Sequence, residues 1–393
     1  MTITPTNPIS GRAGRYVRQS SGDAAYRAFV PAPLPPDPPL ELTPALVSRI
    51  SAADQALARL DGAASALPNP DLFVAQFVRK EALLSSQIEG TQASLEDLFE
   101  HDAGRAAVRS GHVEEVVNYI RAMNYGLARV DSLPLSLRLV REIHEILLSG
   151  VRGANRGPGE FRRTQNWIGP PGGLLSDAVF VPPPAHEMTG LLGQLETYLH
   201  AGGGYPPVVE VALVHAQFET IHPFLDGNGR VGRLLITFQL CQAGVLARPV
   251  LYLSLFLKRH RQDYYSLLTD VREQGDWESW VSFFLDAVTS SASHALNAAR
   301  AISDLRGRHH ALVREHGLGP AGQVLIDYLL ERPLVSVQDV AAAIGRTYGT
   351  ANRLVSEFER LGLLRESTGR SRNRRFTYGE YYDVLREGTE LEA

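Results

Sequence analysis

The chain has 393 residues, of which 44% are hydrophobic and 21% are charged, and its formal net charge is −4 at pH 7. This composition excludes a disordered or fibrous chain, and the length suits about two or three domains. The small negative charge excludes a general attraction to nucleic acid or anionic membranes. The single cysteine, Cys241, excludes a disulfide framework and a cysteine metal cluster.

Residues 1–40 are rich in proline, glycine and serine, so we expect an extended arm there, or a strap that lies on a later domain. From residue 41 to residue 110, apolar side chains recur at helical spacing and predict a helical region. Its second helix follows Asn69-Pro70 and ends at Gly90, with Asp71 as the expected N-cap.

Residues 111–291 form a longer unit that the apolar spacing again predicts to be mainly helical. Two short β-prone runs interrupt it, at 164–168 and 178–181, and a Gly-Pro-Pro-Gly-Gly turn separates them. We therefore predict a β-hairpin that projects from the helices. A helical linker is expected over 292–319.

The tail, residues 320–393, follows the order of a winged helix-turn-helix: short helix, turn, longer helix, strand, basic turn, strand. From residue 321 onward it has ten arginines against eleven acidic residues, so DNA binding and a protein-recognition or dimer-positioning role both stay open. The candidate phosphate contacts of the wing are Arg365, Arg370, Arg372, Arg374 and Arg375.

No apolar run in the chain approaches the roughly 18 residues that span a bilayer. The first residues also lack the apolar core of a signal peptide. We therefore expect a cytoplasmic protein that makes no membrane contact.

The stretch His222–Arg233, HPFLDGNGRVGR, combines a histidine, an aspartate, an asparagine, three glycines and two arginines, which are residue types of catalytic and phosphate-binding sites. It contains Gly-x-Gly-x-x-Gly, but the helical periodicity before it argues against the strand that a dinucleotide fingerprint needs. Pro223 should end the preceding helix and leave the histidine beside a loop. Asn228 is expected to cap the next helix, whose first amides favour an anion.

The same stretch carries groups that suit a polyphosphate. Arg230 and Arg233 lie three residues apart and share a helix face, while Gly227 and Gly229 allow a ligand close to the backbone. Asp226 supplies an oxygen ligand suited to Mg²⁺. A histidine with a pKa near 6.5 is a general base at neutral pH. A tight turn with solvated charges explains any one of these residues, but not the combination.

The stretch resembles the Fic family signature HPFx[DE]GNGRxxR at every fixed position. PLPPDPPLEL, LPNPDLFVAQFVRKEALLSSQIEGT and FRRTQNWIG also resemble bacterial Fic proteins, so the resemblance runs from about residue 30. It implies a mainly α fold, with a Fic-type helical domain, a β-hairpin flap and a C-terminal winged helix. It also implies a protein adenylyltransferase that uses ATP and Mg²⁺ to attach AMP to a Tyr, Ser or Thr hydroxyl of a protein, its own chain included.

The resemblance assigns roles residue by residue. It makes His222 the catalytic base and Asp226 the Mg²⁺ ligand. The phosphate-binding residues that it implies are Gly227, Asn228, Gly229, Arg230 and Arg233. The flap and adenine contacts that it implies are Asp177, Ala178, Val179, Phe180, Tyr264 and Tyr265. Ordinary helix packing is an equal interpretation of the two tyrosines.

Upstream, the segment from Ser85 to Gly90 matches the family's inhibitory pattern [ST]xxxE[GN]. In relatives with this pattern the glutamate pairs with the second arginine of the signature and displaces the ATP γ-phosphate, so Glu89 is expected to inhibit through Arg233. A glutamate at a helix C-terminus is also unfavourable unless it has a partner. The alternative is a solvated surface glutamate.

Other functions stay open at this point. The Fic region could be an ATP-sensing switch of a transcription regulator, or an enzyme that removes AMP or transfers UMP. Phosphorylation is disfavoured, because family members that phosphorylate depart from the signature at the positions of Asp226 and Gly229. Assembly into a homodimer stays open as well.

Overall fold

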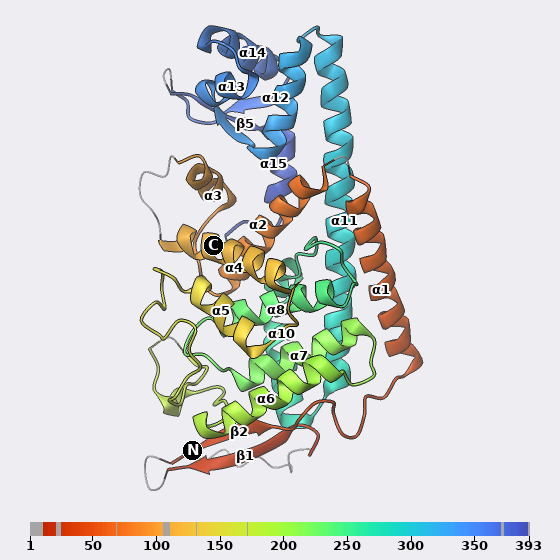
Figure 1. The fold of residues 1–393 in the computed structure, drawn as a ribbon, viewed down its shortest axis with the longest axis vertical. Coiled ribbons are helices and arrows are strands. Elements are labelled where there is room, and N and C mark those ends of the chain that lie inside the picture. The colour runs from red at the N-terminus through yellow and green to blue at the C-terminus, as the bar shows by residue number, and fades with distance from the viewer. Residues whose placement is uncertain are drawn as a thin grey trace.

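The structure is a computed structural model that describes residues 11–20, 25–67, 69–104, 111–130, 132–170, 172–370 and 373–391. Helices make up most of this part of the chain, with one small sheet near the N-terminus and another in the C-terminal module (Figure 1). The mainly helical fold class that the sequence predicts is confirmed.

An antiparallel hairpin precedes the first helix. Strand β1 (Gly14–Gln19) pairs with β2 (Tyr26–Pro31), with Tyr16 opposite Phe29. The expectation of an extended arm over residues 1–40 is therefore wrong for this segment. The two facing rings lie edge to face, with 5.2 Å between their centroids, and this contact favours the pairing.

The N-terminal helices begin with α1 (Pro44–Ser65), which packs along the longest helix of the molecule. In α2 (Pro70–Ile88) the N-cap is Asn69, whose side chain accepts a hydrogen bond from the backbone N–H of Leu72. Asp71 lies in the first turn instead, so its prediction as the cap is wrong. The next helices are α3 (Leu95–Asp102), α4 (Gly111–Val130) and α5 (Leu137–Leu147).

Two antiparallel helices, α7 (Pro207–Ile221) and α8 (Asn228–Gln242), form the centre of the molecule. From Val211 onward every residue of α7 is buried, as expected for a helix that is hydrophobic on nearly all sides. This pair holds the short loop that contains the signature residues. The surrounding helices are α6 (Ala185–Ala201), α9 (Ser254–Arg259) and α10 (Arg261–Gln274).

The predicted hairpin over 164–181 is reduced to one antiparallel bridge, between Ile168 and Phe180. A short 3₁₀ helix, η2 (Leu175–Asp177), lies between the two bridged residues. The backbone N–H of Phe29 in β2 donates to the carbonyl of Val181 at 2.9 Å, so the second run pairs partly with the N-terminal hairpin.

Helix α11 (Trp277–Glu315) is one continuous helix of 39 residues. It runs beside α1 and continues to the C-terminal module (Figure 1). Residues 292–315 of the expected linker are therefore its second half. Its buried stripe continues through Ala295, Ala299 and Ile302, so packing supports the helix across the expected boundary.

The C-terminal module has the winged helix-turn-helix order that the sequence predicts, with a three-stranded sheet in the order β3-β5-β4. Three of the predicted wing arginines pair within the chain: Arg375 with Glu100, Arg374 with Glu359 and Arg365 with Asp383. Arg372 lies outside the described residues. The elements are α12 (Gly319–Glu331), β3 (Leu334–Ser336), α13 (Val337–Ile344), α14 (Tyr348–Arg360), β4 (Leu364–Glu366), β5 (Arg375–Tyr378) and α15 (Gly379–Arg386).

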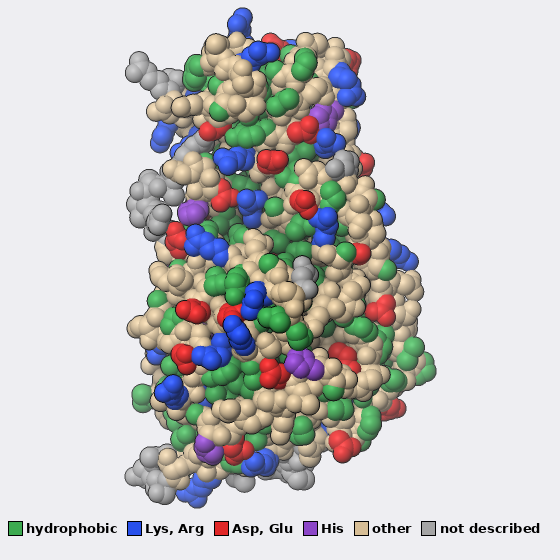
Figure 2. All heavy atoms as spheres, viewed as in Figure 1, with side chains coloured by type: hydrophobic (Ala, Val, Ile, Leu, Met, Phe, Trp, Pro, Cys, Tyr) green, Lys and Arg blue, Asp and Glu red, His purple; other side chains and the backbone are tan. Residues whose placement is uncertain are grey.

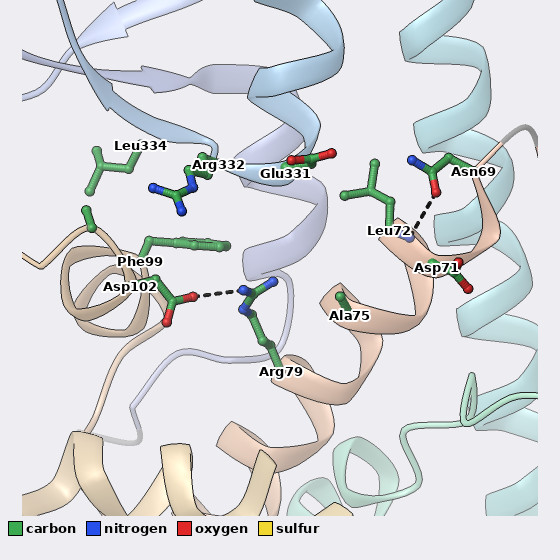
Figure 3. A pocket seen from close by; sticks show the side chains of 11 residues that line it. Asn69, Asp71, Leu72, Ala75, Arg79, Phe99, Asp102, Glu331, Arg332 and Leu334 are labelled. Carbon is green, nitrogen blue, oxygen red and sulfur yellow. Dashed lines mark hydrogen bonds and ion pairs between the residues drawn. The ribbon is translucent and has the colours of Figure 1, made fainter. Parts of the chain in front are cut away.

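The module meets helix α2 at two points. Near the start of α2, Gln76 donates to the carbonyl of Leu330 at 3.3 Å, and near its end Gln87 donates to the carbonyl of Thr389 at 3.0 Å. A cavity of ≈ 500 Å³ lies between α2, α3 and the module, beside the ion pair of Arg79 and Asp102 (Figure 3). No residue that the sequence predicts for the nucleotide site lines this cavity.

On the face of the molecule that Figure 2 shows, acidic and basic side chains are interspersed, with no continuous field of one sign. Among the described helices, none is both long and apolar enough to cross a membrane.

Candidate active site

The turn between α7 and α8 begins at His222, which has left-handed backbone angles of φ 49° and ψ 62°. Helix α7 ends one residue earlier, as predicted from Pro223. Gly227 is the N-cap of α8 with φ 81°, so Asn228 is not the cap. Instead, the Asn228 amide accepts from the backbone N–H of Phe224 and donates to the same residue's carbonyl, both at 2.8 Å.

The prediction of an Asn228 cap is therefore wrong, because this side chain closes the turn instead. One consequence concerns the start of α8: no side chain of the N-cap satisfies its first amides. Unsatisfied amides at a helix N-terminus, together with the helix dipole, favour an anion at this position.

The imidazole of His222 is oriented by the backbone. Its Nδ1 lies 3.3 Å from the carbonyl oxygen of Glu219, which can only accept a hydrogen bond, so Nδ1 carries the proton and Nε2 keeps its lone pair. Burial lowers the pKa of His222 to about 4, and the nearby Arg272 and Arg162 add to this effect. The ring is therefore neutral at pH 7.

Arg233 of α8 is buried and meets the end of α2. Its Nε donates to Ser85 Oγ at 2.8 Å, and its Nη2 donates to the Ser85 carbonyl at 3.0 Å and to Glu89 Oε1 at 2.7 Å. Burial raises the pKa of Glu89, but the Arg233 guanidinium outweighs it and holds this pKa below its ordinary value. The structure thus brings together the three residues that the sequence links.

The Glu89 carboxylate lies against the first turn of α8. A Cβ atom added at Gly229 would be 2.3 Å from Glu89 Oε1 and 3.1 Å from Arg233 Nη1. Glycine is therefore required at this position to let the carboxylate approach the helix. Glu89 lies at the place where the geometry of α8 favours an anion.

Arg230 is also buried, and its charge partners are more distant. Its Nη2 lies 3.6 Å from Asp226 Oδ1 and its Nη1 lies 3.8 Å from Glu115 Oε2. Within the described part of the chain, Nε and Nη1 of Arg230 and Nη1 of Arg233 have no hydrogen-bond partner. Buried donors without an acceptor are rare in native proteins, and an anionic ligand would supply acceptors here.

Asp226 is suited to one coordination position of a divalent cation. Its carboxylate accepts from the backbone N–H of Gly227 at 2.6 Å and remains 36% exposed. Gly153 makes room for it, because a Cβ there would lie 2.7 Å from Asp226 Oδ2. The described residues contain no cluster of three or more His, Cys, Asp or Glu that could hold a metal. A Mg²⁺ ion would take its other ligands from phosphate and water, as is usual for this ion.

The predicted flap residues lie in different surroundings. Asp177 and Val179 are exposed, and Ala178 is half-buried. Phe180 is buried between Phe29 of the N-terminal hairpin and the Arg272 guanidinium, which lies 4.0 Å from the ring centre. Its ring therefore anchors the flap to the body of the molecule.

The two predicted adenine contacts also differ from each other. Tyr264 is buried and its hydroxyl lies 2.8 Å from Nε2 of His215, so packing explains it. Tyr265 is 42% exposed, and the Arg261 guanidinium lies 5.8 Å from its ring centre. The other nitrogen of His215 lies 3.2 Å from the Gly232 carbonyl, so this buried histidine has a hydrogen-bond partner at each ring nitrogen.

Sequence reasoning missed several side chains that complete the site. Glu115 accepts from Thr91 Oγ1 at 2.6 Å and lies near both Arg152 and Arg230. Arg162 donates to the carbonyl of His222 at 3.0 Å. Glu219 lies one turn before the histidine on α7. No local pattern marks Glu115 and Arg162, because their partners come from distant segments.

Family models match the part of the chain that contains this turn. The model described as Fic/DOC family N-terminal matches residues 47–128, and the model described as Fic/DOC family matches residues 134–240, which include the whole turn. Residues 47–128 and 134–240 thus match the two parts of a Fic/DOC region. A third model, described as HTH DNA binding domain, matches residues 323–377.

Curated relatives carry the name protein adenylyltransferase Fic. The protein from Culex quinquefasciatus is 33% identical over 202 residues, which is 48% of this chain and 36% of that protein. The protein from Aedes aegypti is 32% identical over 206 residues, which is 51% of this chain and 38% of that protein. The match thus spans little more than a third of these relatives.

Solved structures share the fold. A Fic family protein from Desulfovibrio desulfuricans has a TM-score of 0.56 at 21% identity, and the match covers 86% of this chain and 97% of that one. A Fic domain containing signaling protein from Bacteroides thetaiotaomicron has a TM-score of 0.50 at 18% identity, covering 65% of this chain and 97% of that one. At these identities the comparison speaks for the fold alone.

Proposed function

We propose that this chain is a protein adenylyltransferase that transfers AMP from ATP to a Tyr, Ser or Thr hydroxyl of a protein, and that Glu89 inhibits it. The observation that carries this proposal is the pair of Arg233 and Glu89 at the uncapped start of α8, beside the neutral His222. The names of the curated relatives support the same activity.

His222 acts as the general base. Its Nε2 lone pair accepts the proton of the target hydroxyl while the hydroxyl oxygen forms a bond to the α-phosphorus of ATP. The bond from that phosphorus to the bridging oxygen breaks, and pyrophosphate leaves. The Nδ1 hydrogen bond to the Glu219 carbonyl holds the tautomer that this step requires.

The start of α8 and its two arginines bind the phosphates. The free amides and the helix dipole stabilise the charge, and the unpartnered nitrogens of Arg230 and Arg233 donate to phosphate oxygens. Asp226 would hold Mg²⁺, which neutralises phosphate charge when it is bound. Positioning and charge stabilisation are the main requirements of such phosphoryl chemistry.

Inhibition follows from competition for one guanidinium. Arg233 cannot give its Nη2 fully to both Glu89 and a phosphate, and the Glu89 carboxylate lies where that phosphate would bind. ATP then binds in a less productive position until the end of α2 moves away. The pKa of Glu89 lies below its ordinary value, so this carboxylate stays charged at neutral pH.

The C-terminal module is not needed for this chemistry. Its match to an HTH DNA binding domain allows contact with DNA, but three wing arginines already pair with carboxylates of the chain. An ATP-sensing regulator would bind DNA differently with and without ATP. The proposed enzyme would label protein from ATP without any DNA.

The test is incubation of the full chain and of Glu89→Gly with ATP and Mg²⁺, using ATP labelled at the α-phosphate and, separately, at the γ-phosphate. We expect α-label on protein, more in the variant, and AMP adducts on Tyr, Ser or Thr by mass spectrometry. Transfer of the γ-label instead would assign phosphorylation. No α-label in a lysate treated with either protein would overturn the proposal.

A further inference from the structure

One acidic side chain of the site has no role in the chemistry described so far. Glu219 lies on α7, three residues before His222, and is only 6% exposed. Its Oε1 has no hydrogen-bond partner in the part of the chain that the structure describes. A buried carboxylate oxygen without a donor is unfavourable, so a missing donor from a ligand is a direct explanation.

The carboxylate points toward the face of α8 that Glu89 also contacts. A Cβ added at Gly232 would lie 2.5 Å from Glu219 Oε1, just as one at Gly229 would meet Glu89. These two glycines are three residues apart and share one face of the helix. Glu89 contacts this face at Gly229, near the N-terminus of α8, and Glu219 contacts it at Gly232, about one turn later.

The order of groups along α7 matches the order of groups in ATP. At 1.5 Å per residue, Glu219 lies about 4.5 Å along the axis from His222, and His215 lies about 10.5 Å from it. His215 is hydrogen-bonded to the Tyr264 hydroxyl, and the exposed ring of Tyr265 lies beside the Tyr264 ring. An α-phosphorus at His222 would place the ribose next along α7 and the base beyond it, toward the exposed ring of Tyr265.

We propose that Glu219 accepts a hydrogen bond from a ribose hydroxyl of the nucleotide and thereby selects ribonucleoside triphosphates. This inference rests on the proposed function of the site. A neutral hydroxyl donor suits the carboxylate, whereas a phosphate beside it would be repelled. Glu219 is thus a binding residue for the nucleoside and takes no part in proton transfer.

The surroundings favour a donor from the ligand. Burial raises the pKa of Glu219 to about 7, while Arg233 and Arg272 act in the opposite direction. Neither arginine makes a hydrogen bond with this carboxylate. Arg233 donates to Ser85 and Glu89, and Arg272 donates to Thr220 Oγ1 and to the backbone carbonyl of Glu219. A ribose hydroxyl at this place would supply the missing donor and stabilise the ionised form.

The experiment compares ATP, 2′-deoxy-ATP and 3′-deoxy-ATP as substrates of Glu89→Gly, which is expected to be active. In this background we expect kcat/KM to fall about 10- to 150-fold for at least one deoxy analogue, the range for a hydrogen bond to a charged group. With Glu219→Ala added, ATP should lose a similar factor and the deoxy penalty should fall to about 1. Glu219→Gln, which keeps an acceptor oxygen, should retain part of the penalty.

Glu210→Gln is the matched control, because it makes the same change on α7 far from the turn, where Glu210 accepts from Gly203 and Tyr205. It should keep the full deoxy penalty. Thermal melting checks that each variant folds, and Glu219→Gln decides the question if Glu219→Ala does not.

Equal use of all three nucleotides by the parent, or an equal deoxy penalty with and without Glu219, would overturn the inference. The inference would also be overturned if the loss of kcat/KM in the Glu219 variants depended on the 6-amino group of adenine. Purine riboside triphosphate, which lacks that group, tests this. Calorimetric binding of the same nucleotides to Glu89→Gly separates the two proposals. If no AMP is transferred, the proposed function fails, while the binding ratios still decide the role of Glu219.

Discussion

The catalytic turn and the end of α2 meet at the same helix N-terminus, but they are held there differently. The turn is fixed by its own neighbourhood: Asn228 closes it on Phe224, and Arg162 and Asn166 donate to the His222 carbonyl. The end of α2 is held at α8 by the Arg233 guanidinium, through Ser85 and Glu89. The catalytic geometry therefore does not need its inhibitor, and removal of the inhibitor should leave the turn intact.

The largest expected effect comes from the catalytic turn. In the Glu89→Gly background, His222→Ala should slow AMP transfer by about 10²–10⁴-fold, because the general base is lost. ATP binding should change little, since the phosphates contact α8 and its arginines. Single-turnover rates and calorimetric ATP binding measure the two effects. Transfer within a few-fold of the background would remove His222 from the mechanism.

The next effect comes from the inhibitory segment, and its sign is opposite. Glu89→Gly should raise AMP transfer about 10- to 150-fold, since a charge-assisted pair is worth roughly 1.5–3 kcal/mol and its loss frees Arg233 for phosphate. Incorporation of α-labelled ATP at matched protein and Mg²⁺ concentrations measures it.

Arg233→Ala is the control for this comparison. It breaks the same ion pair but also removes the phosphate's partner, so no gain is expected. An equal gain in both variants would show that the pair itself holds the turn, and an unchanged rate in Glu89→Gly would return Glu89 to a structural role.

A smaller effect is expected for the single carboxylate of the turn. Asp226→Ala should raise the Mg²⁺ concentration for half-maximal transfer at least about tenfold, because even outer-shell partners of metal ligands contribute about 10- to 100-fold in affinity. Mg²⁺ titrations of the transfer rate in the Glu89→Gly background measure this. Superimposed titration curves would make Asp226 a turn residue only.

The smallest effect should be that of pH. With the pKa of His222 near 4, the base stays unprotonated and the single-turnover rate at saturating ATP should be flat from pH 8 to about pH 5.5. It should fall only as the pH approaches 4. An ordinary histidine would give a midpoint near 6.5. Glu219→Gln in the same background controls for the other group near the turn that titrates around pH 7.

The sequence predicted the turn well because its determinants are local. Pro223 ends α7, glycine permits the left-handed backbone at Gly227, and the inhibitory segment is a short motif. The role of Asn228 was mistaken because capping and loop closure use the same side chain, and only the three-dimensional turn decides between them. Glu219 was missed because the feature that distinguishes it is a buried carboxylate oxygen without a hydrogen-bond donor. A sequence pattern cannot show that a donor is absent.

The strands were harder to predict than the helices. The pairing of β1 with β2 and the single bridge at Ile168 both depend on which segments lie beside each other, and the alternation of short runs does not specify that. The second run of the flap pairs with the first run at one bridge and also accepts one hydrogen bond from the N-terminal hairpin. For α11 the periodicity was clear, but no local signal showed that both halves form one helix.

Because α11 is one continuous helix, its length affects both the distance and the rotation of the C-terminal module relative to the catalytic turn. Its 39 residues span about 58 Å at 1.5 Å per residue. Beyond residue 305 it carries the winged helix through Arg306 with Asp327 and His309 with Tyr378. One residue inserted near residue 300 would turn everything beyond it by about 100° around the helix axis. The residue count of α11, together with the contacts of the module to α2 and α3, therefore sets the direction in which a molecule bound to the winged helix would face His222.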